Sequence, residues 1–260
     1  MRTFLGVTTK PTRNPVSIRS PNPAARLRLF CFPYAGGGSA TYREWTNWLP
    51  ADIEVATVQL PGREWRIQED PLEDMRALAG DAFENIRNHL DKPYALLGAS
   101  MGGLLIFELA RKLRDAGDSQ PVCLLPFACG APHTPETELF HDLPDEELID
   151  EIRNFGVMTD AVADHQELVD LVLPVLRADC VAHETYEYTE AKSFDFPIWV
   201  YGGMGDDTMN RERLDAWAVH TTGDSGVHMI NGGHLFVDDR SELLMQSLVR
   251  RLYKSLELVG

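Results

Sequence analysis

A serine lies between small residues in the stretch GASMGG, which begins at Gly98 and places Ser100 in a G-x-S-x-G pattern. The apolar run YALLG precedes it and a helix-like pattern follows at once. A strand, a tight turn and a helix in this order hold a serine hydroxyl clear of the sheet. Flanking glycines suit the cramped turn, and the helix N-terminus favours developing negative charge. Ser100 is therefore predicted to be a nucleophile; the alternative is a plain strand-to-helix turn.

A serine hydroxyl needs a base to take its proton, and the chain offers eight histidines. On a strand–helix scaffold of this kind the acid and then the histidine follow the serine, each on a loop after a later strand. His234 fits this order, just past the last predicted strand in INGGHLFVDD. His228 lies inside that strand and is interpreted as a packed or edge residue. His133 follows an earlier strand and is predicted to line the site rather than to act as the base.

The acid that orients such a histidine is expected after the preceding strand. The run WVYGGMGDDTMN places Asp206 and Asp207 there. Either carboxylate could hold the imidazole tautomer and stabilise the imidazolium. The residues alone leave the choice between the two open.

Acyl transfer also requires donors to the oxyanion. The backbone N–H of Met101, directly after the serine, is one candidate, and the glycine-rich loop FPYAGGGSA after the first long strand is expected to supply another. This loop has neither the GxGxxG nor the P-loop pattern, which argues against nucleotide binding. No histidine or cysteine cluster has metal-ligand spacing, so neither a metal nor another cofactor is expected.

The elements that must position these residues alternate along the chain. Strand-like runs cover 26–34, 53–60, 94–98, 121–130, 196–203 and 225–232, and helix-like runs cover 72–90, 101–117, 211–221 and 241–256. Strands this apolar are buried on both faces, and helices between them are typical of parallel crossovers. The pattern predicts an α/β fold with one doubly wound, mostly parallel sheet.

Residues 134–192 break the alternation. They contain helical patterns at 143–156 and 165–188, the second with a kink or break predicted at Pro174. About 60 residues are too many for a plain connection, and a helical lid over a site is favoured over a structural subdomain or a second helical layer. The core is therefore assigned to 26–133 and 193–260. Residues 1–25, with four prolines, are predicted to form a flexible basic leader.

The composition limits the class of protein. The formal net charge is −16, and every acidic residue lies after residue 30, so an acidic body argues against a general nucleic-acid binder. The four cysteines form no CxxC pair and indicate reduced, mostly buried thiols. No stretch has the pattern of a signal peptide or a membrane span. A cytoplasmic protein without membrane contacts is expected.

Taken together, the motifs resemble the type II thioesterases of polyketide and nonribosomal peptide synthesis, within the α/β-hydrolase superfamily. The resemblance runs from about Arg28 to the C-terminus. It rests on FPYAGGGSATYREW, VQLPGRE, GASMGG, GAPH, LPDEEL, LPVLRAD with ETYEY, YGGMGDD with LDAW, and GGHLF, in this order. Two positions depart from the family's usual histidines, Tyr34 in the oxyanion loop and Ala99 before the nucleophile. Both are expected to line the pocket and to affect substrate preference.

The resemblance implies an α/β-hydrolase fold with a helical lid, and it assigns a role to each site residue. Ser100 is the nucleophile, His234 the base and Asp206 the orienting acid, which resolves the choice against Asp207. The backbone N–H groups of Ala35 and Met101 form the oxyanion hole. The implied substrates are acyl groups on the phosphopantetheine arm of acyl or peptidyl carrier proteins.

Other functions fit the same residues. A small-molecule carboxylester hydrolase or lipase would use the same three side chains, and an acyltransferase would pass the acyl group to an acceptor other than water. A non-catalytic protein that binds an acyl carrier or a small ligand belongs to a different class, and the intact serine, acid and histidine argue against it. Docking of an acidic carrier would need a basic or apolar patch. The leader arginines, or Arg111, Lys112 and Arg114, are the candidates.

Overall fold

The chain is seen here in a computed structural model that describes residues 13–134, 136, 139–158, 162, 164–239 and 241–258. Seven strands form one twisted sheet in the order β1-β3-β2-β4-β5-β6-β7. Their bounds are β1 Val16–Ile18, β2 Leu27–Phe32, β3 Ile53–Val58, β4 Tyr94–Ala99, β5 Leu124–Phe127, β6 Ile198–Gly203 and β7 Ser225–Ile230. All neighbouring pairs are parallel except β1 with β3. The predicted doubly wound, mostly parallel sheet is confirmed.

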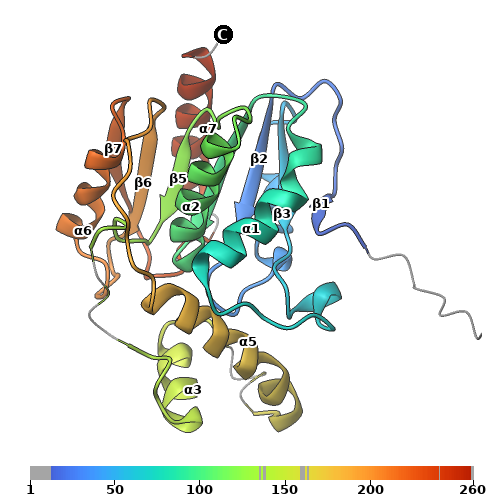
Figure 1. Ribbon diagram of the computed structural model, residues 1–260, viewed down its shortest axis with the longest axis vertical. Coiled ribbons are helices and arrows are strands. Elements are labelled where there is room, and N and C mark those ends of the chain that lie inside the picture. The colour runs from blue at the N-terminus through green and yellow to red at the C-terminus, as the bar shows by residue number, and fades with distance from the viewer. Residues whose placement is uncertain are drawn as a thin grey trace, which may run out of the picture.

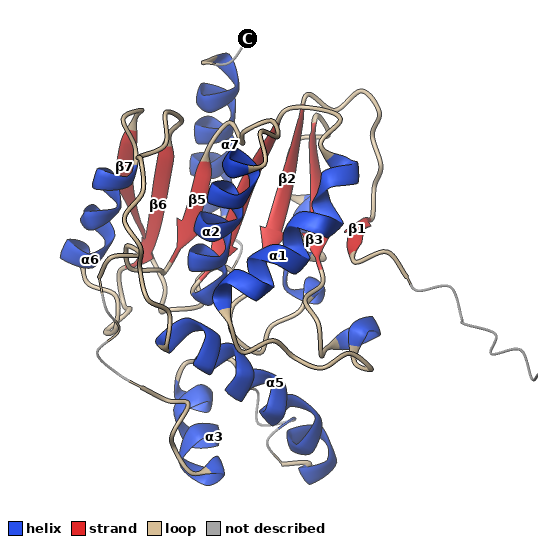
Figure 2. Cartoon of the chain, in the orientation of Figure 1, coloured by secondary structure: helices blue, strands red, loops and turns tan. Residues whose placement is uncertain are grey.

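Helices cover both faces of this sheet, as Figures 1 and 2 show. Helices α1 (Met75–Ile86), α2 (Met101–Asp115) and α6 (Arg211–Asp215) share a buried apolar cluster with one face. Helix α7 (Glu242–Glu257) packs on the other face with a second cluster. The central strands β2 to β6 are buried along their whole length, which explains their continuous apolar runs.

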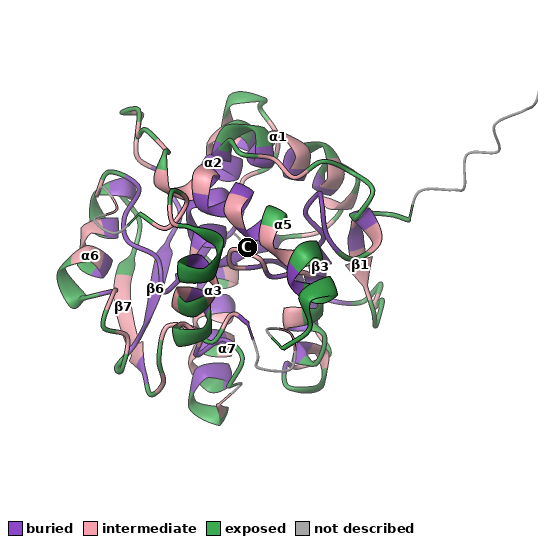
Figure 3. Cartoon of the chain, turned by 90° about the horizontal axis from the view of Figure 1, so that it is seen from below, coloured by how far each residue is buried: buried purple, intermediate pink, exposed green. Residues whose placement is uncertain are grey.

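Helices α3 (Asp145–Asn154) and α5 (Gln166–Glu184) lie between β5 and β6 in the chain. They lie beyond the carboxyl ends of the parallel strands, at the bottom of Figure 1. Their buried apolar residues form a third cluster, against which Ala35 of the loop after β2 packs. Seen from this side, α3 is largely exposed while the strands behind it are buried (Figure 3). The described part of 134–192 contains helices and no strand.

Two details differ from the sequence predictions. Val16–Ile18 lie within the predicted flexible leader, yet they form β1, paired with β3 from Val16 opposite Val58 to Ile18 opposite Ala56. Such a short edge strand gives too little alternation to be detected from sequence. Helix α5 continues through Pro174, so of the predicted kink or break the break is wrong, and the kink stays a prediction. Among the described helices, none combines the length and the hydropathy that a bilayer crossing needs. All four cysteines are free and buried, as predicted.

Candidate active site

Ser100 forms the corner between β4, which ends at Ala99, and α2, which begins at Met101. Its backbone has φ 49° and ψ −119°, a region that non-glycine residues rarely adopt. The corner is held because the Ser100 N–H donates to the carbonyl of Phe127 on β5, at 2.7 Å.

Only glycine fits on either side of this corner. A Cβ added at Gly98 would lie 1.9 Å from the carbonyl oxygen of Gly102. A Cβ added at Gly102 would lie 2.6 Å from the carbonyl oxygen of Pro33. In both cases the obstacle is backbone, which cannot move aside. The spacing of G-x-S-x-G is thus a steric requirement of the turn that presents Ser100.

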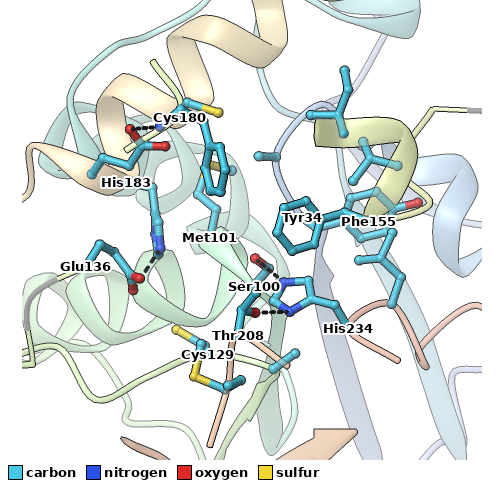
Figure 4. A pocket seen from close by; sticks show the side chains of 18 of the residues that line it. Tyr34, Ser100, Met101, Cys129, Glu136, Phe155, Cys180, His183, Thr208 and His234 are labelled. Carbon is cyan, nitrogen blue, oxygen red and sulfur yellow. Dashed lines mark hydrogen bonds and ion pairs between the residues drawn. The ribbon is translucent and has the colours of Figure 1, made fainter. Parts of the chain in front are cut away.

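Ser100, His234 and Asp206 form one line of hydrogen bonds, although they come from three distant parts of the chain. Nε2 of His234 lies 2.9 Å from Oγ of Ser100, and its Nδ1 lies 2.8 Å from Oδ2 of Asp206. Figure 4 shows the imidazole between Ser100 and Thr208. The Asp206 side chain is 1% exposed and that of His234 14%. Asp207, the other acid that the sequence left open, is exposed at the cavity rim.

Asp206 is an ionised carboxylate held by several donors. Its Oδ1 accepts from the backbone N–H of Thr208 at 3.0 Å, from Oγ1 of Thr208 at 2.8 Å and from the N–H of Met209 at 3.2 Å. Burial alone would raise the pKa of Asp206, but the hydrogen bonds and charge of His234, with the Thr208 donors, outweigh it and lower the pKa. The negative charge therefore faces Nδ1 of His234, which favours the tautomer whose Nε2 can accept a proton.

The backbone groups expected to bind an oxyanion lie beside the serine. Met101 is the first residue of α2, and N–H groups in a first helical turn have no partner within the helix. Ala35 is the second residue of a tight turn in which the N–H of Gly37 donates to the carbonyl of Tyr34 at 2.9 Å. Both Ala35 and Met101 line the same cavity as Ser100. Their roles as oxyanion donors stay predictions.

A cavity of about 370 Å³ lies between the hydrogen-bonded residues Ser100, His234 and Asp206 and the helices α3 and α5. Its apolar lining comes mainly from the segment between β5 and β6: Phe140, Ile152, Phe155, Val157 and Leu176. The ring of Phe155 meets that of His234 edge-on, at 5.5 Å between centroids. A long apolar group could extend from Ser100 into this space.

Three further residues were predicted to line the site, and only one does. Tyr34 lines the cavity, and its hydroxyl donates to Asp238 at 3.1 Å. The prediction for Ala99 is wrong: its side chain belongs to the buried cluster that packs against α7, because strand residues alternate between the two faces. His133 lines a neighbouring hollow instead, where its Nδ1 lies 2.8 Å from Nε2 of His220. His133 is therefore not among the residues that line the cavity around Ser100, although Glu136, later in the chain, is.

Sequence reasoning missed a charged cluster on the opposite wall of the cavity. Oε1 of Glu136 lies 2.7 Å from Nη2 of Arg213. It lies 3.3 Å from Nε2 of His183, a contact marked by a dashed line in Figure 4. Burial opposes ionisation of Glu136, but His183 and Arg213 lower its pKa to about 2. The three residues are far apart in sequence and form no motif, so no sequence signal could have found them. Within the described residues, no group of three or more potential ligands could hold a metal ion.

Comparisons with known proteins agree with this geometry. The family model of the thioesterase domain matches residues 27–254. A curated relative, the gramicidin S biosynthesis protein GrsT of Aneurinibacillus migulanus, is 37% identical over 89% of this chain and 91% of its own. The solved structure of RedJ, a thioesterase from the prodiginine biosynthetic pathway of Streptomyces coelicolor, is 36% identical, with a TM-score of 0.82 over 87% of this chain and 86% of that chain.

The type II thioesterase BorB, from the borrelidin biosynthetic cluster, is 33% identical in its solved structure. It has a TM-score of 0.83 over 94% of this chain and 100% of that one. These matches span almost the whole chain, so the predicted family, the α/β-hydrolase fold and an enzyme of the hydrolase class are confirmed. The chain belongs to the thioesterase family and groups with its type II members.

Proposed function

We propose that this thioesterase hydrolyses acyl groups from the phosphopantetheine arm of carrier proteins and thereby clears wrong or stalled acyl groups from a polyketide or nonribosomal peptide assembly line. Ser100 is the nucleophile, His234 the base and Asp206 the orienting acid. The observation that carries the proposal is the unbroken series of hydrogen bonds from Ser100 through His234 to Asp206, at the wall of a cavity that has both apolar and charged lining residues.

The first half of the reaction forms an acyl-enzyme. Nε2 of His234 takes the proton of Ser100 as Oγ attacks the carbonyl carbon of the thioester. The oxyanion lies between the N–H groups of Ala35 and Met101. The carbon–sulfur bond then breaks, and the thiol leaves with the proton from His234. An acyl ester on Ser100 remains.

The second half releases the acid. A water molecule gives a proton to His234, and its oxygen attacks the acyl-serine carbonyl. The bond to Oγ breaks, Ser100 takes the proton back, and a free carboxylic acid leaves. Because a thiol is a good leaving group, the protein contributes mainly placement and stabilisation of the oxyanion.

The segment 134–192 acts as a lid in this proposal. It supplies Phe140, Ile152, Phe155, Val157 and Leu176 to the apolar cavity lining, with Ile152 on α3 and Leu176 on α5, so it encloses the acyl chain on that side. Phe155 packs against His234 and shields the imidazole from water on that side. Such exclusion of water strengthens every electrostatic contact at the serine.

The carrier would dock close to the cavity mouth. Of the basic residues considered from sequence, Arg111 donates to Oγ1 of Thr189 at 3.1 Å and Arg114 to the carbonyl of Lys192 at 2.7 Å. These two side chains fasten the segment that returns to β6, which favours a structural role for them. The leader arginines are then the better candidates for binding an acidic carrier. We place the enzyme in the cytoplasm, together with its carriers.

The test is to load acyl groups of graded chain length onto the phosphopantetheine arm of a carrier protein and to follow loss of the acyl mass by intact-protein mass spectrometry. Wild-type protein should release the acid, and Ser100→Ala should not. Rapid cleavage of simple esters with no action on any acyl carrier would favour a carboxylester hydrolase instead. Transfer of the acyl group to an added amine or alcohol in preference to water would indicate an acyltransferase.

A further inference from the structure

Asp179 is a carboxylate on α5 with no exposed surface at all. It receives two hydrogen bonds from Arg63, from Nη1 to Oδ2 at 2.5 Å and from Nη2 to Oδ1 at 2.8 Å. A third comes from the backbone N–H of Gly36, which donates to Oδ2 at 2.8 Å. Gly36 directly follows Ala35, so a side chain of α5 holds the loop that supplies a predicted oxyanion donor.

Arg63 holds the same loop from its other side. It follows β3, is 6% exposed, and donates to the carbonyl of Gly37 at 3.2 Å and to that of Pro61 at 3.1 Å. Asp179 thus binds the N–H of Gly36 while Arg63 binds the carbonyl of Gly37. This one ion pair therefore makes hydrogen bonds to the turn that begins at Tyr34 from both sides.

Helix α5 also packs directly on this turn. Gly36 has φ 74°, and a Cβ added there would lie 3.1 Å from Cδ1 of Leu176. Ala35 packs against the apolar cluster to which Leu176 belongs. The position of the loop therefore depends on both polar and apolar contacts with α5.

A buried ion pair contributes little to stability on balance, because removing both charges from water offsets most of their attraction. Its benefit here is geometric. Donors to an oxyanion must be placed within about half an ångström to act, and loops are less precise than helices or strands. A bidentate arginine–carboxylate pair fixes distance and direction together.

We propose that Asp179 and Arg63 are positioning residues that hold the loop 34–38 so that the Ala35 N–H faces the oxyanion. Helix α5 is then part of the apparatus that stabilises the transition state, in addition to covering the acyl chain. This inference rests on the proposed function, since it assigns a support to the oxyanion donor of the same site.

The test replaces both partners at once, Arg63→Met with Asp179→Leu, so that no unpaired charge is left buried. The matched control is Arg28→Met with Glu54→Leu, because Arg28 and Glu54 form another buried pair, 2.5 Å apart and 6% and 3% exposed. That pair lies at the amino ends of β2 and the neighbouring β3, away from Ser100. Each variant is assayed for kcat and KM on an acyl-carrier substrate and for inhibition by an alkylboronic acid, which forms a tetrahedral adduct on the serine.

The Arg63/Asp179 variant should lose at least tenfold in kcat with KM within threefold of wild type. Its inhibition constant for the boronic acid should rise by a similar factor, because the adduct mimics the tetrahedral intermediate. The control should keep kcat and boronate affinity within twofold, whatever its melting temperature. Equal kcat in the two folded double variants would overturn the inference.

If the double variant does not fold, Arg63→Lys serves as a second probe. Lysine keeps the charge for Asp179 but lacks the planar fork that also reaches Gly37. It should lower kcat and boronate affinity together by at least threefold, and no change in either would equally overturn the inference. Failure of the proposed function would show elsewhere, as a wild-type protein that releases no acyl group or an active Ser100→Ala variant.

Discussion

Replacing Asp206 by asparagine is the perturbation whose outcome the site geometry specifies most closely. The three donors from Thr208 and Met209 at Oδ1 should select the amide oxygen for that position. The amide nitrogen then takes the place of Oδ2, 2.8 Å from Nδ1 of His234. An amide N–H donates there, so Nδ1 must accept and the proton of the neutral imidazole moves to Nε2. A protonated Nε2 cannot take the proton of Ser100.

The expected cost is large because the fold is kept while the tautomer is wrong. The same exchange in a serine protease lowers kcat by about 10⁴. At about 1.4 kcal/mol per tenfold change, this corresponds to about 5.5 kcal/mol of transition-state stabilisation. Substrate binding does not involve Asp206, which is 1% exposed, so KM should change little.

The assay is steady-state release of an acyl group from a carrier protein, with Asp207→Asn as the matched control. Asp207 is the adjacent acid and is exposed, so its substitution should change kcat less than threefold. A loss of tenfold or less in Asp206→Asn, or an equal loss in both variants, would refute the tautomer argument. It would leave His234 without an identified orienting acid.

Three other perturbations have defined outcomes. Gly98→Ala should lower the free energy of unfolding by more than about 3 kcal/mol, because the added Cβ would lie 1.9 Å from a backbone oxygen. In the control Gly80→Ala, on α1, the added Cβ would meet only side-chain atoms of Lys112 at 3.9 Å. Thermal denaturation should show this control to be neutral or stabilising. Glu136→Gln should lower the free energy of unfolding by up to about 3 kcal/mol at pH 7, because the pKa of Glu136 is about 2 in the folded protein and near 4.3 in the unfolded chain. Urea titrations should show a constant difference from wild type above pH 5 that shrinks as the pH falls toward 2. Ile152→Phe should fill part of the cavity and shift the ratio of kcat/KM toward shorter acyl chains by at least tenfold, and an unchanged chain-length profile would place the acyl chain elsewhere.

The site could be predicted from sequence where the signal is local. The tight turn around Ser100 is predicted by a strand, two glycines and a helix in immediate succession. The role of His234 is predicted by a glycine pair after the last strand. The prediction that Ala99 lines the pocket is wrong because side chains of a strand alternate between the two faces of the sheet even next to the turn, which directs Ala99 into the buried cluster. His133 was misplaced because the direction of a loop after a strand is not encoded in its spacing.

Contacts between distant segments could not be predicted. Arg63 and Asp179 are 116 residues apart and meet only because α5 folds back over the loop after β2. Glu136 and Arg213 are also far apart in the chain and meet at one wall of the cavity. No periodicity links such pairs, since each depends on the packing of whole elements. The edge strand β1 was missed for a different reason, because three residues are too few to show a period of two.

The most direct test of the central claim is to find where the acyl group goes during turnover. Wild-type protein is mixed with an acyl-carrier substrate, quenched in acid within milliseconds to seconds, digested, and mapped by mass spectrometry. An acyl mass on the peptide that contains Ser100, rising and then decaying as free acid appears, is the predicted result. An acyl adduct on a different residue, or undiminished turnover by Ser100→Ala, would contradict it.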